Sequence, residues 1–187
     1  PEACGRAIRQ LIENSGLSLK VAVITGDDLM PKLDQVLRSE PAEMFTDDPT
    51  PPREAIASAN AYLGAFPIAE ALNQGADIVV TGRCVDSAVT LGACIHRFGW
   101  QRDDLDLLAA GSLAGHLIEC GPQATGGNYT DWHAVADSLH EVGYPIAEIA
   151  ADGAVVMTKP KGTGGCVTIG TVGEQLLYEI GDPAAYY

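Results

Sequence analysis

The segment Ala76–Trp100 constrains the fold more than any other part of the sequence. Within it, Ile78–Thr81 is apolar and mostly β-branched, in a run short enough for a buried strand. Gly82 follows, and a polar turn then leads into apolar residues at helical spacing as far as Phe98, before Gly99. The segment therefore predicts a strand–turn–helix unit, which is a building block of α/β domains with parallel strands.

The polar turn of this unit contains Arg83 and Asp86. In open α/β sheets, ligands bind outside the carboxyl ends of the strands, where such turns lie. We therefore expect Arg83 to bind a substrate carboxylate or phosphate through paired hydrogen bonds, and Asp86 to be catalytic. The alternative is structural: Arg83 pairs with Asp86, and Asp86 or Ser87 caps the following helix.

Helical and strand-like patterns alternate along the rest of the chain. They predict one α/β domain with a mostly parallel, mixed sheet flanked by helices in three layers. The sheet is expected to be mixed because Asp152-Gly153 is a turn pair typical of hairpins. The expected strands are Leu19–Thr25, Ile56–Leu63, Ile78–Thr81, Ile146–Ala150 and Ala154–Thr158. The expected helices are Pro1–Asn14, one capped by Asp27 or Asp28 and ending near Leu37, Pro67–Asn73, Val85–Phe98, Leu105–Cys120, Trp132–Val142, and Val167–Ile180 closed by Gly181.

The segment Ser39–Arg53 is rich in proline and acidic residues, and Met44 and Phe45 are its only large apolar residues. A loop of this length in a compact domain is either a lid over a site or a loosely ordered surface excursion. Both interpretations are open at the level of sequence.

Composition excludes several classes of function. The net charge of −14 argues against binding to nucleic acid or to an anionic membrane surface, and no apolar run approaches the ~20 residues of a membrane span. The five cysteines are odd in number and form no CxxC pair, which predicts a reducing, cytoplasmic compartment. The 187 residues suit a single domain. Because they begin without Met and an amphipathic pattern starts at once, we expect either an internal fragment of a longer protein or a processed piece.

A glycine-containing loop, Lys159–Gly165, connects an expected strand to an expected helix. Glycines allow close backbone approach to a ligand, and the amides at a helix N-terminus favour an anion. The candidate substrate-binding residues of this loop are Lys159, Lys161, Thr163, Gly164 and Gly165. The loop matches neither the P-loop nor the dinucleotide-binding fingerprint, so a tight turn with solvated lysines is an equal alternative.

The loop Glu119–Tyr129 is the second candidate site. Glu119 could act as a general acid or base and Cys120 as a nucleophile. Residues Gln123, Thr125, Gly126, Gly127 and Asn128 could supply hydrogen-bond donors to a substrate. The alternative is a helix C-terminus followed by an ordinary turn.

Metal binding is not expected, because the sequence lacks both HExxH and paired CxxC motifs. A zinc site is the weaker alternative. His116 and Cys120 would share a helix face there, and His133 could add a ligand.

Three long blocks of the sequence resemble the acyclic terpene utilisation family. They are ANAYLGAFPIAEALNQGADIVVTGRCVDSAVTLG, AGHLIECGPQATGGNYTDW and KPKGTGGCVTIGTVGEQLLYEIGDP. The resemblance starts near Pro1 and is weakest in Ser39–Arg53. It implies that the chain is a portion of a longer family domain, associated with bacterial breakdown of citronellol- and geraniol-like compounds through acyl-CoA thioesters. It implies no established catalytic residues.

We therefore expect an enzyme or enzyme subunit that acts on a small branched carboxylate or acyl-CoA-type substrate in catabolism. The alternatives are a non-catalytic binding or assembly subunit and a zinc-dependent enzyme. The expected partners are a small anionic molecule or acyl-CoA, together with a second copy or another subunit. The sequence identifies no cofactor.

Overall fold

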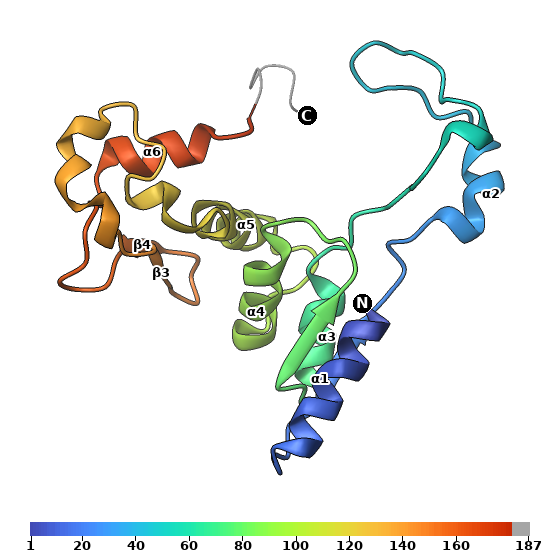
Figure 1. Cartoon of the computed structure of the whole chain (residues 1–187), viewed down its shortest axis with the longest axis horizontal. Helices are drawn as coiled ribbons and strands as arrows, with labels where there is room; N and C mark the ends of the chain where they lie inside the picture. The colour runs from blue at the N-terminus through green and yellow to red at the C-terminus, as the bar shows by residue number, and fades with distance from the viewer. Residues whose placement is uncertain (181–187) are drawn as a thin grey trace. The chain divides into compact units, whose positions relative to one another are not determined.

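The computed structural model describes residues 1–180 and divides the chain into two compact units, Pro1–Val85 and Asp86–Tyr187. Figure 1 follows the helices and strands along the chain. Each unit is described separately below. Whether the two units form a single domain stays a prediction.

The first unit is built around a parallel pair of strands, β1 (Val21–Ile24) and β2 (Ile78–Thr81). Val21 lies opposite Ile78, and the register continues to Ile24 opposite Thr81. This pair confirms both expected strands at their apolar cores.

Helices α1 (Glu2–Asn14) and α3 (Phe66–Asn73) pack against this parallel pair (Figure 1). A Cβ atom on Gly5 would collide with the side chain of Val23, so this glycine allows α1 to approach β1 closely. Ile68 and its neighbours in α3 form the buried core of the unit. Both helices match their predicted ranges within about two residues, which is the usual uncertainty of helix ends.

Between β1 and α3 the chain is less regular. It contains a 3-10 helix (Met30–Lys32), the short α2 (Leu33–Leu37) and a second 3-10 helix (Arg53–Ala55). The predicted strand Ile56–Leu63 is wrong, because this stretch makes only isolated bridges at Asn60 and Leu63. Its alanines and serine have too little β-propensity and side-chain surface to hold a continuous ladder.

The second unit begins with two packed helices, α4 (Ala88–Phe98) and α5 (Leu105–Glu119). Gly99 ends α4 with φ of 70°, as its position predicts. The glycines of α5 allow the close approach that the sequence suggests. A Cβ on Gly111 would collide with Leu91 and Trp100, and one on Gly115 would lie 2.7 Å from the backbone oxygen of Ser87.

Trp100 is buried in this unit. Its ring stacks on Phe98 at 5.3 Å between centroids, and its indole N–H donates to the Ala151 carbonyl at 3.0 Å. This contact fixes the start of the turn that joins the two hairpin strands.

The predicted hairpin is confirmed. Strands β3 (Ile146–Ile149) and β4 (Val155–Thr158) pair antiparallel, with Ile146 opposite Thr158. Gly153 takes φ of 86° in the turn, a conformation that favours glycine.

Two other predictions for this unit need correction. The expected helix Trp132–Val142 is a pair of 3-10 helices, Trp132–Ala134 and Ala136–Glu141. Helix α6 (Ile169–Leu177) is shorter than the predicted Val167–Ile180, because Thr168 and Thr171 form a capping box that sets its first turn. The expected closure at Gly181 lies outside the described residues.

The α/β class is supported, but the mostly parallel three-layer sheet is not confirmed. Within residues 1–180 the structure contains one parallel pair and one antiparallel pair of strands. Of the helices in the described part of the chain, none is long and apolar enough to cross a membrane.

Candidate functional site

Three carboxylates meet in the second unit. Asp86 precedes α4, Glu119 ends α5 and Glu179 follows α6, and one oxygen from each lies within 4.8 Å of the others. We call these residues the carboxylate cluster. Asp86 and Glu119 are candidates from the sequence, and Glu179 is a residue that sequence reasoning missed.

Helix packing explains why these three residues meet. The close contact between Gly115 and Ser87 places the start of α4 beside the last turns of α5. Helix α6 is tied to α5 because the fully buried Gln175 donates from Nε2 to the His116 carbonyl at 2.9 Å. Glu179 then follows α6 with φ of 60°, which turns the chain sharply.

Cys120 lies beside Glu119 of the carboxylate cluster, in surroundings that keep its thiol protonated. Its Sγ–H donates to Glu119 Oε1 at 2.6 Å. Burial, followed by the hydrogen bond and negative charge of Glu119, raises the pKa of the Cys120 thiol to about 11. Because the thiolate is the nucleophilic form, this environment favours Cys120 as a hydrogen-bond donor to Glu119.

The cluster has the chemistry of a hard-cation site. Carboxylate oxygens are the ligands that Mg²⁺ and Ca²⁺ prefer, and this is the one group of three potential ligand side chains found among residues 1–180. The residues of the zinc alternative do not belong to this cluster, because the group contains neither His116 nor Cys120. His116 Nε2 lies 3.2 Å from the Leu176 carbonyl, and His133 packs on Trp132.

The loop after Cys120 forms a 3-10 helix, Gly121–Thr125. The Gly126 and Gly127 amides donate to the Gln123 and Pro122 carbonyls at 3.0 and 2.9 Å. Thr125 is fully buried, and its hydroxyl donates to the Gly143 carbonyl at 2.6 Å. These donors are therefore engaged inside the protein, which favours the structural alternative for this part of the loop.

Asn128 differs from its neighbours. Its Nδ2 lies 3.5 Å from Gln123 Oε1, and its buried Oδ1 has no hydrogen-bond partner within residues 1–180. Of the predicted binding residues in this loop, Asn128 and Gln123 retain the most capacity for new hydrogen bonds. Their role in substrate binding stays a prediction.

The polar groups of the Lys159–Gly165 loop are also hydrogen-bonded within the protein. Lys159 Nζ donates to the Thr163 carbonyl at 2.6 Å, and Thr163 Oγ1 donates to the Pro160 carbonyl at 2.7 Å. The Gly164 and Gly165 amides donate to Glu141 O and Ser138 Oγ. Lys161 is exposed. This geometry favours a tight turn over an anion cradle, and the binding roles of these residues stay predictions.

Arg83 belongs to the first unit, at the carboxyl end of β2. Its guanidinium lies 5.6 Å from the centroid of the Tyr62 ring, and its amide donates to Asp27 Oδ2 at 2.8 Å. Ser87 occupies the N-cap of α4, but its side chain makes no capping hydrogen bond within the described residues. Of the two caps expected for this helix, Asp86 or Ser87, the Ser87 side chain is therefore not one.

Asp27 is a buried carboxylate that the sequence suggested only as a helix cap. It accepts hydrogen bonds from the Arg83 amide and from Asn60 Nδ2, the latter at 3.2 Å. A Cβ on Gly82 would collide with it. The Arg83 amide is the main cause that lowers the pKa of Asp27, partly opposed by burial. The sequence feature that could have identified Asp27 is its position. Asp27 and Gly82 each follow one of the two parallel strands, so both lie at the same edge of the strand pair.

Comparison with known proteins gives a family but no characterised relative. No curated protein and no solved structure matches the chain. The family model described as "Acyclic terpene utilisation family protein AtuA" matches residues 1–187. The chain therefore belongs to the acyclic terpene utilisation family AtuA.

Proposed function

We propose that this chain is an enzyme, or the catalytic part of one, that acts on a small branched carboxylate or acyl-CoA-type substrate. The observation that carries the proposal is the carboxylate cluster, in which Glu119 lies within 4.8 Å of Asp86 and Glu179. Paired carboxylates are a common means of moving protons during catalysis. Membership of a family named for terpene utilisation supports the substrate class.

In this proposal Glu119 is the general acid or base. Asp86 and Glu179 are exposed and set the charge around it. Cys120 acts as a positioning residue, because its thiol donates to Glu119 Oε1 and restricts the orientation of that carboxylate. A divalent cation bound by the three carboxylates would add a Lewis acid at the same place.

The test incubates the protein with citronellyl-CoA, geranyl-CoA and the corresponding free acids, with and without Mg²⁺, and follows substrate loss by mass spectrometry. We expect one of these substrates to be consumed, and Glu119→Gln to slow that reaction by about 10²–10⁴-fold, the usual contribution of a general acid or base. Glu148→Gln, at an exposed site on the hairpin, is the matched control. Unchanged turnover in Glu119→Gln, or no consumption of any substrate, contradicts the proposal.

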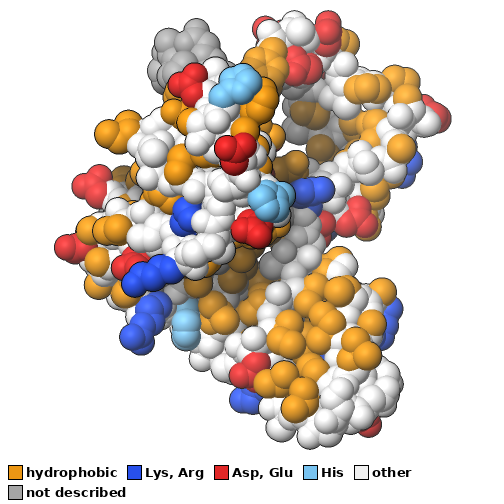
Figure 2. Space-filling view, turned by 60° about the vertical axis from the view of Figure 1, so that its left-hand side comes forward, with side chains coloured by type: hydrophobic (Ala, Val, Ile, Leu, Met, Phe, Trp, Pro, Cys, Tyr) orange, Lys and Arg blue, Asp and Glu red, His pale blue; other side chains and the backbone are white. Residues whose placement is uncertain are grey.

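A second candidate function is a non-catalytic binding or assembly subunit. Two observations favour it: the amides of both glycine-rich loops donate internally, and large apolar side chains are exposed, as Figure 2 shows for one face. Ile169 is 95% exposed and Leu105 is 70% exposed. Light scattering after size exclusion tests this candidate, since a homo-oligomer or a complex with another subunit would exceed the monomer mass.

Two further features belong to this proposal. We propose that the two units are parts of one α/β domain that is itself a portion of a longer protein. We also propose a cytoplasmic location, supported by the five cysteines, all of which are free thiols.

A further inference from the structure

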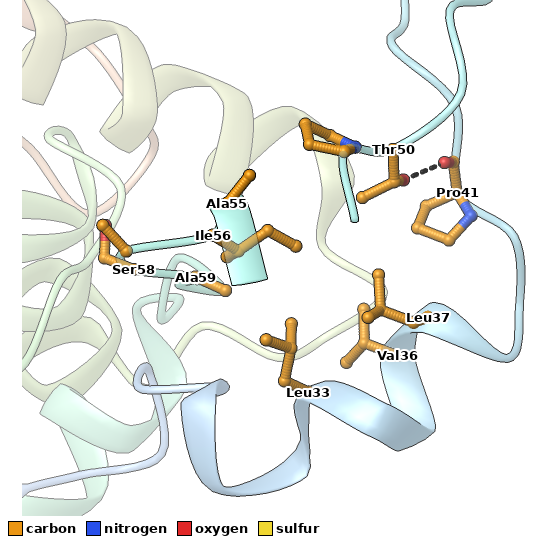
Figure 3. Close-up of a pocket in the computed structure, with 11 residues that line it drawn as sticks. Leu33, Val36, Leu37, Pro41, Thr50, Ala55, Ile56, Ser58 and Ala59 are labelled. Carbon is orange, nitrogen blue, oxygen red and sulfur yellow. Dashed lines mark hydrogen bonds between the residues drawn. The ribbon is translucent and has the colours of Figure 1, made fainter. Parts of the chain in front are cut away.

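The first unit has an apolar groove that the carboxylate cluster does not involve. It has a volume of about 440 Å³ and lies between α2 and the segment that follows the proline-rich loop Ser39–Arg53. Leu33, Val36 and Leu37 project from α2, and Ile56 faces them from the opposite side (Figure 3). Leu33 is buried, but the other three side chains are only half-buried, so the groove leaves apolar surface in contact with water.

The tip of the proline-rich loop, residues 43–48, presents two large apolar side chains to solvent. Met44 is 81% exposed and Phe45 is 80% exposed. The Glu43 carboxylate accepts hydrogen bonds from the Phe45 and Thr46 amides at 2.7 and 2.6 Å. These bonds order the tip in advance, which lowers the entropic cost of docking it against another molecule. Phe and Met are also enriched at protein–protein interfaces.

The tip does not fill the groove of its own chain, because the stem of the loop separates them. In the stem, Ala42 bridges Pro49, and the Thr50 hydroxyl donates to the Pro41 carbonyl (Figure 3). Pro41 and Thr50 line the groove themselves, whereas the tip lies beyond both contacts. In Figure 1 the loop accordingly extends away from α2. The tip and the groove of one chain are therefore both accessible to a second molecule.

The groove is flanked by positive charge, although the chain as a whole is acidic. Lys32 immediately precedes α2 and Arg38 immediately follows it. The acidic residue of α2, Asp34, is already paired with Arg53 Nε at 2.8 Å. The tip, in contrast, has three carboxylates and no basic residue: Glu43, Asp47 and Asp48. The tip and the groove therefore match in two respects, since both are apolar and their flanking charges are opposite.

We propose that the groove binds the loop tip of a second copy of this chain, so that two copies exchange tips around a two-fold axis. Two chains with a net charge of −14 repel each other unless opposite charges meet at their contact, and this exchange brings the acidic tip to the cation-flanked groove. Burial of Phe45 in the apolar groove supplies the attraction. A two-fold axis forms the same contact twice and closes the assembly at a dimer.

This inference goes beyond the proposed catalytic role and does not depend on the carboxylate cluster, which belongs to the other unit. The test is sedimentation velocity of the full chain over a range of concentrations. We expect the monomer to convert to a dimer as the concentration rises. Phe45→Ser should weaken dimerisation about tenfold or more, because it removes an aromatic anchor from the contact. Ile169→Ser is the matched control, since it removes an exposed apolar side chain from the second unit, and it should dimerise as the wild type does.

The charge complementarity has a test of its own. Lys32→Glu should weaken dimerisation severalfold, because it places a like charge beside the incoming acidic tip. Lys161→Glu makes the same change at an exposed site of the second unit and gives the same net charge. It should therefore have the smaller effect.

A mixing experiment tests the exchange of tips directly. Ile56→Asp places a charge in the groove but leaves the tip intact, and it should not dimerise alone. Mixed with Phe45→Ser, whose groove is intact, it should form a heterodimer in which one tip occupies one groove. Circular dichroism checks that both variants are folded.

Three results would overturn the inference: a wild type that stays monomeric up to concentrations on the order of 1 mM, a dimer that Phe45→Ser leaves intact, or no association between Phe45→Ser and Ile56→Asp. A monomer would assign the groove to a molecule other than a second copy, and a dimer that only Ile169→Ser disrupts would assign the contact to the second unit. Glu119→Gln should dimerise as the wild type does, so failure of this inference and failure of the proposed catalytic role give different results.

Discussion

Asp27 is held in its charged form by its neighbours in the first unit. The Arg83 amide and Asn60 both donate to its Oδ2, and its pKa is lowered from the ordinary value of 3.8. The folded state therefore binds this proton less readily than the unfolded chain does. The lowered pKa of Asp27 therefore adds to the free energy of unfolding. This contribution is complete above about pH 4 and is lost as the pH falls through the lowered pKa.

This linkage predicts the behaviour of Asp27→Asn. At pH 7 the variant should have a smaller free energy of unfolding than the wild type, because a charge-assisted hydrogen bond is replaced by a neutral one. The difference should shrink as the pH is lowered below about 4, where the wild type loses its advantage. Urea denaturation at a series of pH values measures both effects.

The control for this experiment is Glu148→Gln, which makes the same charge change at an exposed site of the second unit. A difference between Asp27→Asn and the wild type that stays constant down to pH 2 would contradict the linkage.

At the level of single residues, the sequence predicted part of the candidate site. Asp86 and Glu119 stand at the ends of helices that periodicity locates well, so their role could be suggested from the sequence alone. Glu179 could not be found in this way, because it is 60 residues beyond Glu119 and its approach depends on the buried Gln175 and on a left-handed backbone. The glycine-rich loops were ambiguous, since only the structure reveals which amides are already bonded.

At the scale of elements, α5 depends on small residues where it meets α4. A Cβ on Gly115 would lie 2.7 Å from the Ser87 carbonyl oxygen, and backbone atoms cannot yield as a flexible side chain can. We expect Gly115→Ala to lower the free energy of unfolding by about 1–3 kcal/mol, the usual cost of overpacking. Chemical denaturation of the purified variant measures this change.

Gly173→Ala is the matched control in α6. Among residues 1–180, no atom beyond its chain neighbours and the backbone of its own helix lies within 4 Å of the Cβ that this change would add, so only helix propensity should act, stabilising the protein by about 0.5–1 kcal/mol. If Gly115→Ala were as stable as Gly173→Ala, the close packing of α4 on α5 would be wrong.

The sequence predicted the elements unevenly, for physical reasons. Helices α1, α3 and α4 combine apolar periodicity with a glycine near one end, α5 is a long run of good helix formers that is apolar around most of its surface, and the hairpin has a strong turn signal. Ile56–Leu63 has large side chains only at its two ends, and the residues from Ala57 to Ala61 are too small or too polar to hold a strand. Within Trp132–Val142, the Ser138 hydroxyl donates to the Val135 carbonyl at 3.1 Å, a local side-chain bond of the kind that competes with a regular helix.

At the scale of the whole molecule, negative charge dominates. The net charge of −14 arises from 25 acidic and 11 basic residues. Repulsion among these charges destabilises the compact state more than the extended one. We expect the melting temperature to rise by a few degrees as NaCl increases from about 10 mM to about 500 mM, where screening is nearly complete.

Choline chloride at the same ionic strength is the control, because screening does not depend on the identity of a monovalent cation. A melting temperature that falls with either salt would mean that specific ion pairs outweigh the general repulsion. Differential scanning calorimetry gives the required transition temperatures.

The sheet could not be predicted at this scale. Strand number and pairing depend on contacts between distant segments, which alternating apolar runs do not encode. The pattern therefore predicted both strands of the parallel pair, the first as Leu19–Thr25 where Val21–Ile24 is observed, but the mostly parallel three-layer sheet expected around them is not confirmed. The family, in contrast, could be predicted, because long blocks of residues in a fixed order are specific even where the fold is not.

The positions of the tryptophans give the two units different intrinsic fluorescence. Both tryptophans, Trp100 and Trp132, belong to the second unit, whereas the first unit has Tyr62 as its single tyrosine. Emission excited at the red edge of protein absorbance therefore reports on the unit that holds the carboxylate cluster. A chromophore introduced near α2 would give the first unit a signal of its own, so that events in the two units could be recorded in one sample at two wavelengths.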